Sequence, residues 1–184
     1  FFVGLAAISY MMATTAIIQV ADDETEIEKY KPSFTEDERK DILAYNEISS
    51  KYSKIMNEEL SEKLKLHPVW GELIRQIQKS ETKKQNNISL ALQNNVIINN
   101  DWAPYIPNLF QQGIQYAKMG VSFKDWVDIV RVVKNYLLPV FHNEYHGMSD
   151  KILSLINGMN LFIDAGMTII GESYILELTR TTVS

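Results

Sequence analysis

A long apolar stripe in the last third of the chain constrains the fold more than any other feature. From Ser149 onward, large apolar residues recur at steps of three and four, which is typical of one face of an α-helix. The stripe comprises Ile152, Ile156, Met159, Ile163, Met167, Ile170, Tyr174 and Leu178. Gly158, Gly166 and Gly171 interrupt it. Because glycine costs about 1 kcal/mol in a helix, these glycines indicate either close packing against another element or a helix that is not fully rigid.

The same helical period extends back to about residue 35, and no alternating pattern of useful length predicts a strand. Pro139 should kink or end the helix that contains it, and a turn is expected around Gly147. The sequence therefore predicts an all-α fold. The expected helices before the final one lie at about 35–60, 67–78, 87–98, 102–120 and 121–141.

Local signals mark several helix ends. Thr35 with Glu38, and Ser122 with Asp125, have the three-residue spacing with which a hydroxyl and a carboxylate cap a helix start. Gly120 suits the end of a helix, because glycine readily adopts the left-handed conformation found there.

The charge distribution bounds the partners of this chain. Residues 1–50 carry ten acids and four bases, whereas the remainder carries thirteen acids and fourteen bases. No basic stripe is present, so we expect no nucleic-acid binding. The absence of cysteine excludes disulfides, thiolate metal ligands and a cysteine nucleophile. The run "DDETEIE" at 22–28 is interpreted as part of an acidic linker over 22–34.

Residues 1–21 carry no charged side chain, and roughly 20 apolar residues are enough to cross a bilayer as a helix. Three interpretations stay open: a membrane anchor, a buried or dimer-interface helix, and the apolar part of a signal peptide without a basic segment before it. We expect a cytoplasmic protein, with anchoring to a membrane through residues 1–21 as the alternative.

The stretch "FHNEYHG" at 141–147 resembles a metal site, because His142 and His146 stand four residues apart. Such a pair can bind zinc from one helix face. In zinc proteases, however, glutamate directly follows the first histidine, whereas here Asn143 follows it and Glu144 comes next. The sequence offers no obvious third ligand. We therefore expect an exposed helix end, with a metal site at His142 and His146 as the less favoured alternative.

Haem binding needs an axial ligand, commonly a histidine. The third histidine, His67, stands directly before Pro68 at a helix start, and no histidine lies between them and Phe141. Tyrosine can also ligate haem iron. Tyr105, Tyr116 and Tyr136 therefore stay as alternative ligands.

The sequence offers few other residues that indicate catalysis or ligand binding. No catalytic motif or phosphate-binding glycine loop is present, so no catalytic residue is predicted. Asp164 and Glu172 lie within the apolar last helix, where they either face solvent or form a buried carboxylate switch. Several aromatic residues are typical of a core, and they could also line a small-molecule pocket. The pocket candidates are Trp70, Trp102, Tyr116, Trp126 and Tyr136.

Three features stand together over roughly residues 45–184: "HPVWGELIRQI" with Trp70, the Gly120-Val121-Ser122 turn, and "KILSLINGMNLFIDAGMTIIGESYI" with Tyr174 near its end. In these features the chain resembles the non-haem globin-type sensor domains of bacterial stressosome proteins, and their relatives ahead of PAS and histidine-kinase modules. This resemblance implies a globin-like helical bundle that forms a homodimer. It also implies that the last helix continues as a coiled coil into an output domain.

We interpret the chain as a non-enzymatic sensory and dimerisation domain, with an apolar helix over 1–21, a linker over 22–34 and a globin-like sensor domain over 35–184. No cofactor is expected. The predicted partners are a second copy, an output module and an unidentified small ligand. The alternatives are a haem-binding gas sensor and a membrane-anchored helical structural subunit. The residues expected to carry dimerisation and signalling are Ile156, Met159, Ile163, Met167, Ile170 and Tyr174.

Overall fold

The structure is a computed structural model that describes residues 28–68, 70–71 and 83–183. Its elements within those ranges are α-helices, and no described residue lies in a strand, which confirms the all-α class. The predicted helix over 1–21 lies outside the described residues, as does most of the predicted helix over 67–78. The helices are α3 (Glu36–Lys65), α5 (Lys83–Asn99), α6 (Tyr105–Lys118), α7 (Phe123–Glu144) and α8 (Ser149–Val183).

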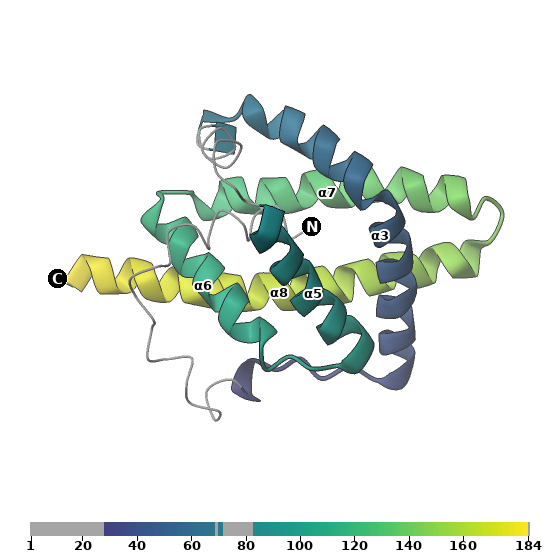
Figure 1. The fold of residues 1–184 in the computed structure, drawn as a ribbon, viewed down its shortest axis with the longest axis horizontal. Coiled ribbons are helices and arrows are strands. Elements are labelled where there is room, and N and C mark those ends of the chain that lie inside the picture. The colour runs from purple at the N-terminus through teal and green to yellow at the C-terminus, as the bar shows by residue number, and fades with distance from the viewer. Residues whose placement is uncertain (1–27, 69, 72–82, 184) are drawn as a thin grey trace.

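The longest helix, α8, forms the axis of the bundle (Figure 1). Its most extensive contacts are with α6 and α3. The turn after α7 contains Gly147 at a φ of 82°, a conformation that glycine adopts without strain. This turn reverses the chain, so that α7 and α8 run antiparallel along the length of the bundle (Figure 1).

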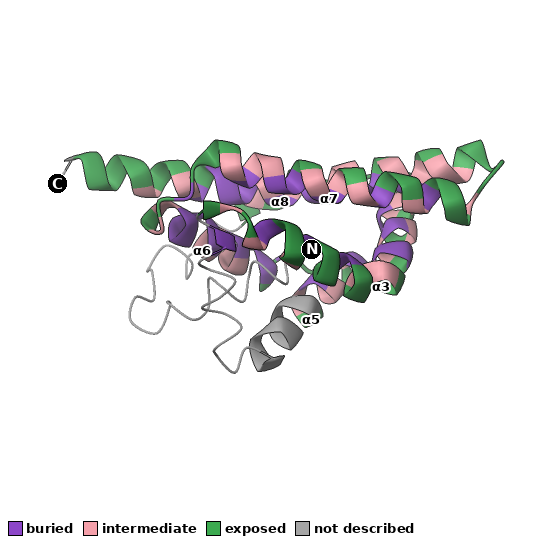
Figure 2. Cartoon of the chain, turned by 90° about the horizontal axis from the view of Figure 1, so that it is seen from above, coloured by how far each residue is buried: buried purple, intermediate pink, exposed green. Residues whose placement is uncertain are grey.

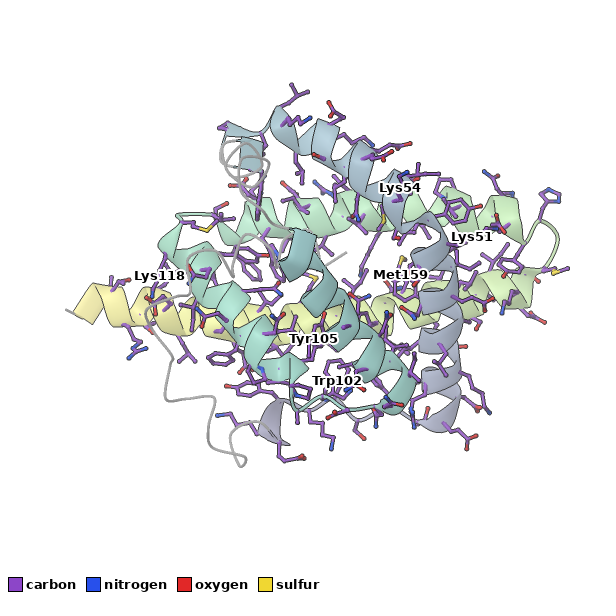
Figure 3. All side chains as sticks on the ribbon, in the orientation of Figure 1. Lys51, Lys54, Trp102, Tyr105, Lys118 and Met159 are labelled. Carbon is purple, nitrogen blue, oxygen red and sulfur yellow. The ribbon has the colours of Figure 1, made fainter. Side chains whose placement is uncertain are left out.

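The core is rich in aromatic side chains and lies between α8 and the helices around it, where the buried residues gather (Figure 2). Figure 3 shows Trp102 and Tyr105 side by side, with ring centroids 6.0 Å apart. Phe162 of α8 packs on both rings. Because such large rings dominate burial energetics, α8 is held chiefly by aromatic contacts in this region.

The predicted helix ends are largely confirmed. Thr35 Oγ1 accepts a hydrogen bond from the Glu38 backbone N–H, and the Glu38 carboxylate accepts one from Thr35. Ser122 Oγ accepts from the Asp125 backbone N–H at 3.1 Å, and Gly120 has a φ of 70°. These bonds satisfy backbone groups that a helix terminus leaves free.

The expectation that α7 could end at Pro139 is wrong, because α7 continues to Glu144. Proline removes one helical hydrogen bond, but Leu137 and Phe141 on either side of it are buried with no exposed surface. Their burial keeps the last turns of α7 against the core.

A glycine lets α8 cross α3 at backbone contact. A Cβ atom added at Gly158 would lie 2.1 Å from the carbonyl oxygen of Asp41 in α3. The Asp41 carboxylate accepts hydrogen bonds from Ser154 Oγ and from Asn157 Nδ2, both one turn or less from that glycine. Close packing, one of the two interpretations of the interrupted stripe, is therefore confirmed at Gly158.

A second glycine, Gly113 of α6, allows an equally close crossing near the other end of α8. A Cβ atom at Gly113 would lie 1.9 Å from Ser173 Oγ and 2.2 Å from the carbonyl oxygen of Ile170. Ser173 has no exposed surface, and its hydroxyl donates to that same carbonyl at 3.0 Å. The two crossings fix the position of α8 relative to α3 and α6.

Replacing Gly158 with alanine should destabilise the fold, although alanine favours helix. Helix propensity contributes about 1 kcal/mol in favour of alanine, but overpacking against rigid structure costs roughly 1–3 kcal/mol. The added methyl would meet backbone rather than a movable side chain. We expect a net loss of up to about 2 kcal/mol in the free energy of unfolding, measured by urea denaturation.

Gly171→Ala is the matched control in the same helix. A Cβ there would meet only the ring edge of Phe123 at 3.4 Å, an ordinary contact. This variant should be as stable as the wild type or more stable, by up to about 1 kcal/mol. Equal stability changes in the two variants would contradict the backbone crossing at Gly158.

Candidate functional site

The end of α8 is clamped where it leaves the bundle. Tyr174 donates a hydrogen bond from its hydroxyl to the carbonyl oxygen of Val121 at 2.9 Å. Its ring lies 5.9 Å from the ring of Phe123, which also touches the position of Gly171. The Gly120-Val121-Ser122 turn and Tyr174, which are distant in the sequence, are therefore joined in one contact.

Beyond this clamp, α8 projects past the other helices (Figures 1 and 2). We call residues 175–182 the α8 extension; its large apolar side chains are Ile175, Leu176 and Leu178, with exposed fractions of 58%, 47% and 42%. Clustered exposed apolar side chains are typical of interaction surfaces. An ion pair between Lys118 Nζ and Glu177 at 3.9 Å ties the extension to the end of α6.

The predicted dimer stripe needs correction. Met159, Ile163 and Ile170 are at most 2% exposed, because they pack into the core of their own chain. They cannot lie on a surface that meets a second copy in this conformation. Ile156 and Met167 are half-buried, as is Tyr174 in its clamp. The exposed apolar surface of α8 lies instead mainly in its extension and at Leu153.

The five aromatic residues predicted to line a pocket lie in three places. Trp70, Tyr116 and Trp126 form one buried cluster, with Tyr116 at 5.6 Å from Trp70 and 6.2 Å from Trp126 between ring centroids. Trp102 belongs to the separate cluster around Phe162. Tyr136 lies on α7 beside α3. The two cavities that the described residues line beside members of this set are each lined by only one of the five.

Two small cavities adjoin members of this set. One lies beside Trp102 and the other beside Tyr136, each with a volume of about 10 Å³. That volume holds about one water molecule.

Among the described residues, three aromatic polar atoms are buried without a hydrogen-bond partner: Trp70 Nε1, Trp126 Nε1 and Tyr105 Oη. Burial raises the pKa of Tyr105, and it raises the pKa of Tyr45 to about 12. The Tyr105 ring is stacked on Phe162 with an interplanar angle of 7°. Haem ligation by Tyr105, Tyr116 or Tyr136 stays an untested alternative, and a haem beside Tyr105 would have to separate these two rings.

The "FHNEYHG" stretch forms the exposed end of α7. The rings of His142 and His146 lie 5.3 Å apart, and both residues are exposed. The carboxylate of Glu144 does not join them, since it accepts hydrogen bonds from Lys51 Nζ at 2.8 Å and from the Tyr52 hydroxyl. In the part of the chain that the structure describes, no three histidine or carboxylate side chains group as metal ligands.

His67 takes part in a helix-start contact. Its Nδ1 accepts from the Trp70 backbone N–H at 3.4 Å, and its Nε2 lies 3.5 Å from the carboxylate of Asp125. This contact links the residues before Trp70 to the first turn of α7.

The hypothesis of a buried carboxylate switch at Asp164 or Glu172 is wrong. The Asp164 side chain is 63% exposed and pairs with Lys134 at 3.0 Å. Glu172 is also exposed, and its interaction with Tyr30 contributes to raising the pKa of that tyrosine. Both carboxylates therefore lie on the surface, as their alternative interpretation predicted.

No family model, curated protein or solved structure matches this chain. The globin-type resemblance therefore stays a prediction. One described helix, Ser149–Thr182, is long and apolar enough to cross a membrane, judged by length and composition alone. Because the core helix of a soluble protein meets the same criteria and 39% of its most apolar window is buried inside the bundle, this is weak evidence for a membrane span.

Replacing Tyr174 with phenylalanine should loosen the end of α8. The change removes the hydrogen bond to Val121 and keeps the ring, so we expect a loss of about 1 kcal/mol in the free energy of unfolding. Faster amide hydrogen exchange should be confined to the last turns of α8. The control is Tyr136→Phe, because the Tyr136 hydroxyl makes no described hydrogen bond; equal effects of both variants would contradict the clamp.

The hydrogen bonds that Glu144 accepts from Lys51 and Tyr52 should make the free energy of unfolding fall in acid. Hydrogen bonds from Lys51 and Tyr52 hold the pKa of Glu144 below its ordinary value of 4.5. A carboxylate with a lowered folded pKa stabilises above its unfolded pKa and loses this effect as pH falls through the folded pKa. Glu144→Gln should therefore flatten the fall in melting temperature below about pH 4.5. Glu58→Gln, which removes a glutamate without a described ion pair, should leave that fall unchanged; the same flattening in both would contradict the assignment.

Proposed function

We propose that this chain is a sensory and dimerisation domain without enzymatic activity, in which α8 carries a conformational change to an output module. The α8 extension would pair with the same segment of a second copy. The observation that carries the proposal is the exposure of Ile175, Leu176 and Leu178 on a helix that projects beyond its own bundle. Two such helices side by side would bury these side chains from water.

The geometry of α8 supports a mechanical role. The crossings at Gly158 and Gly113 hold the helix at backbone contact with α3 and α6. Closely packed elements transmit small displacements because they cannot deform continuously. A ligand or partner that repacks α3 or α6 would then shift the direction of the extension, and a population shift between two directions would be the signal.

The two alternative functions are separated by simple measurements. A haem sensor would show an intense Soret band in the absorption spectrum of the purified chain, at roughly 400 nm for a haem protein. A membrane-anchored structural subunit would sediment with membranes after cell fractionation. No specific contact among the described residues favours either alternative over the dimerising sensor.

The absence of cysteine allows a direct test of pairing. Ile175→Cys introduces a single thiol on the α8 extension, at a side chain that the core does not need. Around a two-fold axis the same residue of each copy can meet, and a disulfide forms when the Cα atoms come within about 7 Å. We expect Ile175→Cys to form a disulfide-linked dimer under mild oxidation, measured on a non-reducing gel.

Leu153→Cys is the control, at an exposed leucine near the other end of the same helix. It should stay monomeric on the gel, because the proposed contact is confined to the extension. Dimer formation at equal rates in both variants would indicate random collision, and no dimer in Ile175→Cys would contradict the proposal.

A further inference from the structure

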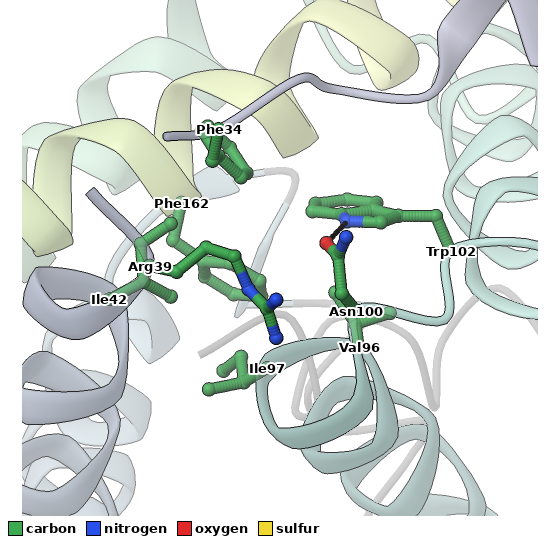
Figure 4. Close-up of a pocket in the computed structure, with 8 residues that line it drawn as sticks. All are labelled: Phe34, Arg39, Ile42, Val96, Ile97, Asn100, Trp102 and Phe162. Carbon is green, nitrogen blue, oxygen red and sulfur yellow. Dashed lines mark hydrogen bonds between the residues drawn. The ribbon is translucent and has the colours of Figure 1, made fainter. Parts of the chain in front are cut away.

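A small, partly open pocket lies where α3, the end of α5 and α8 meet (Figure 4). Its cavity has a volume of about 10 Å³. The walls are aromatic and aliphatic, and include Phe34, Trp102 and Phe162. The polar side chains that line it are Arg39 from α3 and Asn100 from the turn after α5.

Arg39 brings an uncompensated positive charge to this pocket. The residue is half-buried, and its guanidinium group lies among the side chains of the pocket (Figure 4). The guanidinium group makes no hydrogen bond or ion pair with the residues that the structure describes, whereas the Arg39 backbone N–H donates to the carbonyl oxygen of Thr35. Partly burying a charge without a partner is unfavourable, so the position of Arg39 indicates that an acceptor completes the site.

Asn100 adds a second free donor. The Trp102 indole Nε1 donates to Asn100 Oδ1 at 3.2 Å. An indole N–H can only donate, so the oxygen of the amide must face it, and the orientation of the amide is chemically determined. The Asn100 amide N–H₂ makes no described hydrogen bond. Asn100 itself has a φ of 56°, a conformation that asparagine tolerates better than most residues.

The donors and the walls together specify the ligand. Neither the aromatic nor the aliphatic side chains of the pocket carry an acceptor that could satisfy Arg39, and the one side-chain amide oxygen accepts from Trp102 and makes no described hydrogen bond with Arg39. A guanidinium group matches a carboxylate with two parallel hydrogen bonds. Apolar walls favour an alkyl or aromatic group beside that carboxylate.

We propose that this pocket binds the carboxylate of a small organic acid, with Arg39 as the charged donor and Asn100 as the second donor. The cavity has room for about one water molecule, so it takes one oxygen of the carboxylate, and the remainder of the acid extends through the opening. Binding itself does not depend on the dimer. The link to signalling does rest on the proposed function, because an occupant would touch Phe162 of α8.

A competing explanation comes from the end of α5. The last turn of a helix carries a partial negative charge, which a nearby cation complements by about 0.3–1 kcal/mol, and the last turn of α5 contains no basic residue. In that case Arg39 would stabilise the fold and bind nothing. The two explanations differ in whether a carboxylate binds the wild-type chain.

The test uses sodium butyrate as probe and butyramide as its uncharged counterpart of the same shape. The readout is the indole N–H resonance of Trp102 in the ¹⁵N-labelled full chain, assigned with Trp102→Phe. At constant ionic strength, butyrate should shift this resonance saturably and butyramide should not. Arg39→Gln should weaken butyrate binding at least tenfold, as expected for loss of a charge-assisted hydrogen bond.

Two further variants keep the result interpretable. Arg131→Gln removes an exposed arginine on α7 that pairs with Asp128, and it should bind butyrate like the wild type. Arg39→Lys keeps the charge near α5 but loses the two-pronged geometry, so it should keep stability and lose part of the affinity. The proposal is overturned if butyrate causes no saturable shift, if butyramide shifts the resonance equally, or if Arg131→Gln weakens binding as much as Arg39→Gln.

Discussion

Backbone contact between α8 and its neighbours is the constraint on which the rest of the structure depends. At Gly158 no side chain separates α8 from the carbonyl of Asp41, and at Gly113 none separates α6 from the turn at Ile170. Helices that pack through larger side chains keep 8–10 Å between their axes; a glycine at the crossing lets the backbones approach more closely. The aromatic rings around Phe162 then fill the space that these crossings leave between them.

This constraint explains why the end of α8 is the functional candidate. Two crossings hold α8, and Tyr174 adds a third contact where the helix leaves the bundle. The turns beyond Tyr174 have little cover from their own chain and expose three large apolar residues. The pocket at Arg39 lies nearer the start of α8, where α3 and α5 meet Phe162. In the proposed function, this pocket would serve as the input and the α8 extension as the output of the same helix.

The sequence correctly predicted features that depend on local spacing, such as helix caps. It failed for features that tertiary contacts determine, such as which residues of a helix are buried. The caps at Thr35 and Ser122 follow from a three-residue spacing, and both formed. The apolar stripe correctly predicted α8, yet it contains both Ile163 in the core and Leu178 in solvent, so the pattern could not separate an internal face from an external one. Pro139 did not end α7 because the burial of Phe141 outweighs one lost hydrogen bond. Arg39 and Asp41 look like ordinary charges of a helix surface until α5 and α8 pack against them.

Sedimentation equilibrium of the full chain, compared with a chain that ends at Tyr174, tests the central claim most directly. The core and both glycine crossings lie before that residue, so the shortened chain should fold. The account predicts a reversible dimer for the full chain and a monomer for the shortened one over the same concentration range. A full chain that remains monomeric at the highest concentration, or a shortened chain that dimerises with the same constant, would contradict it.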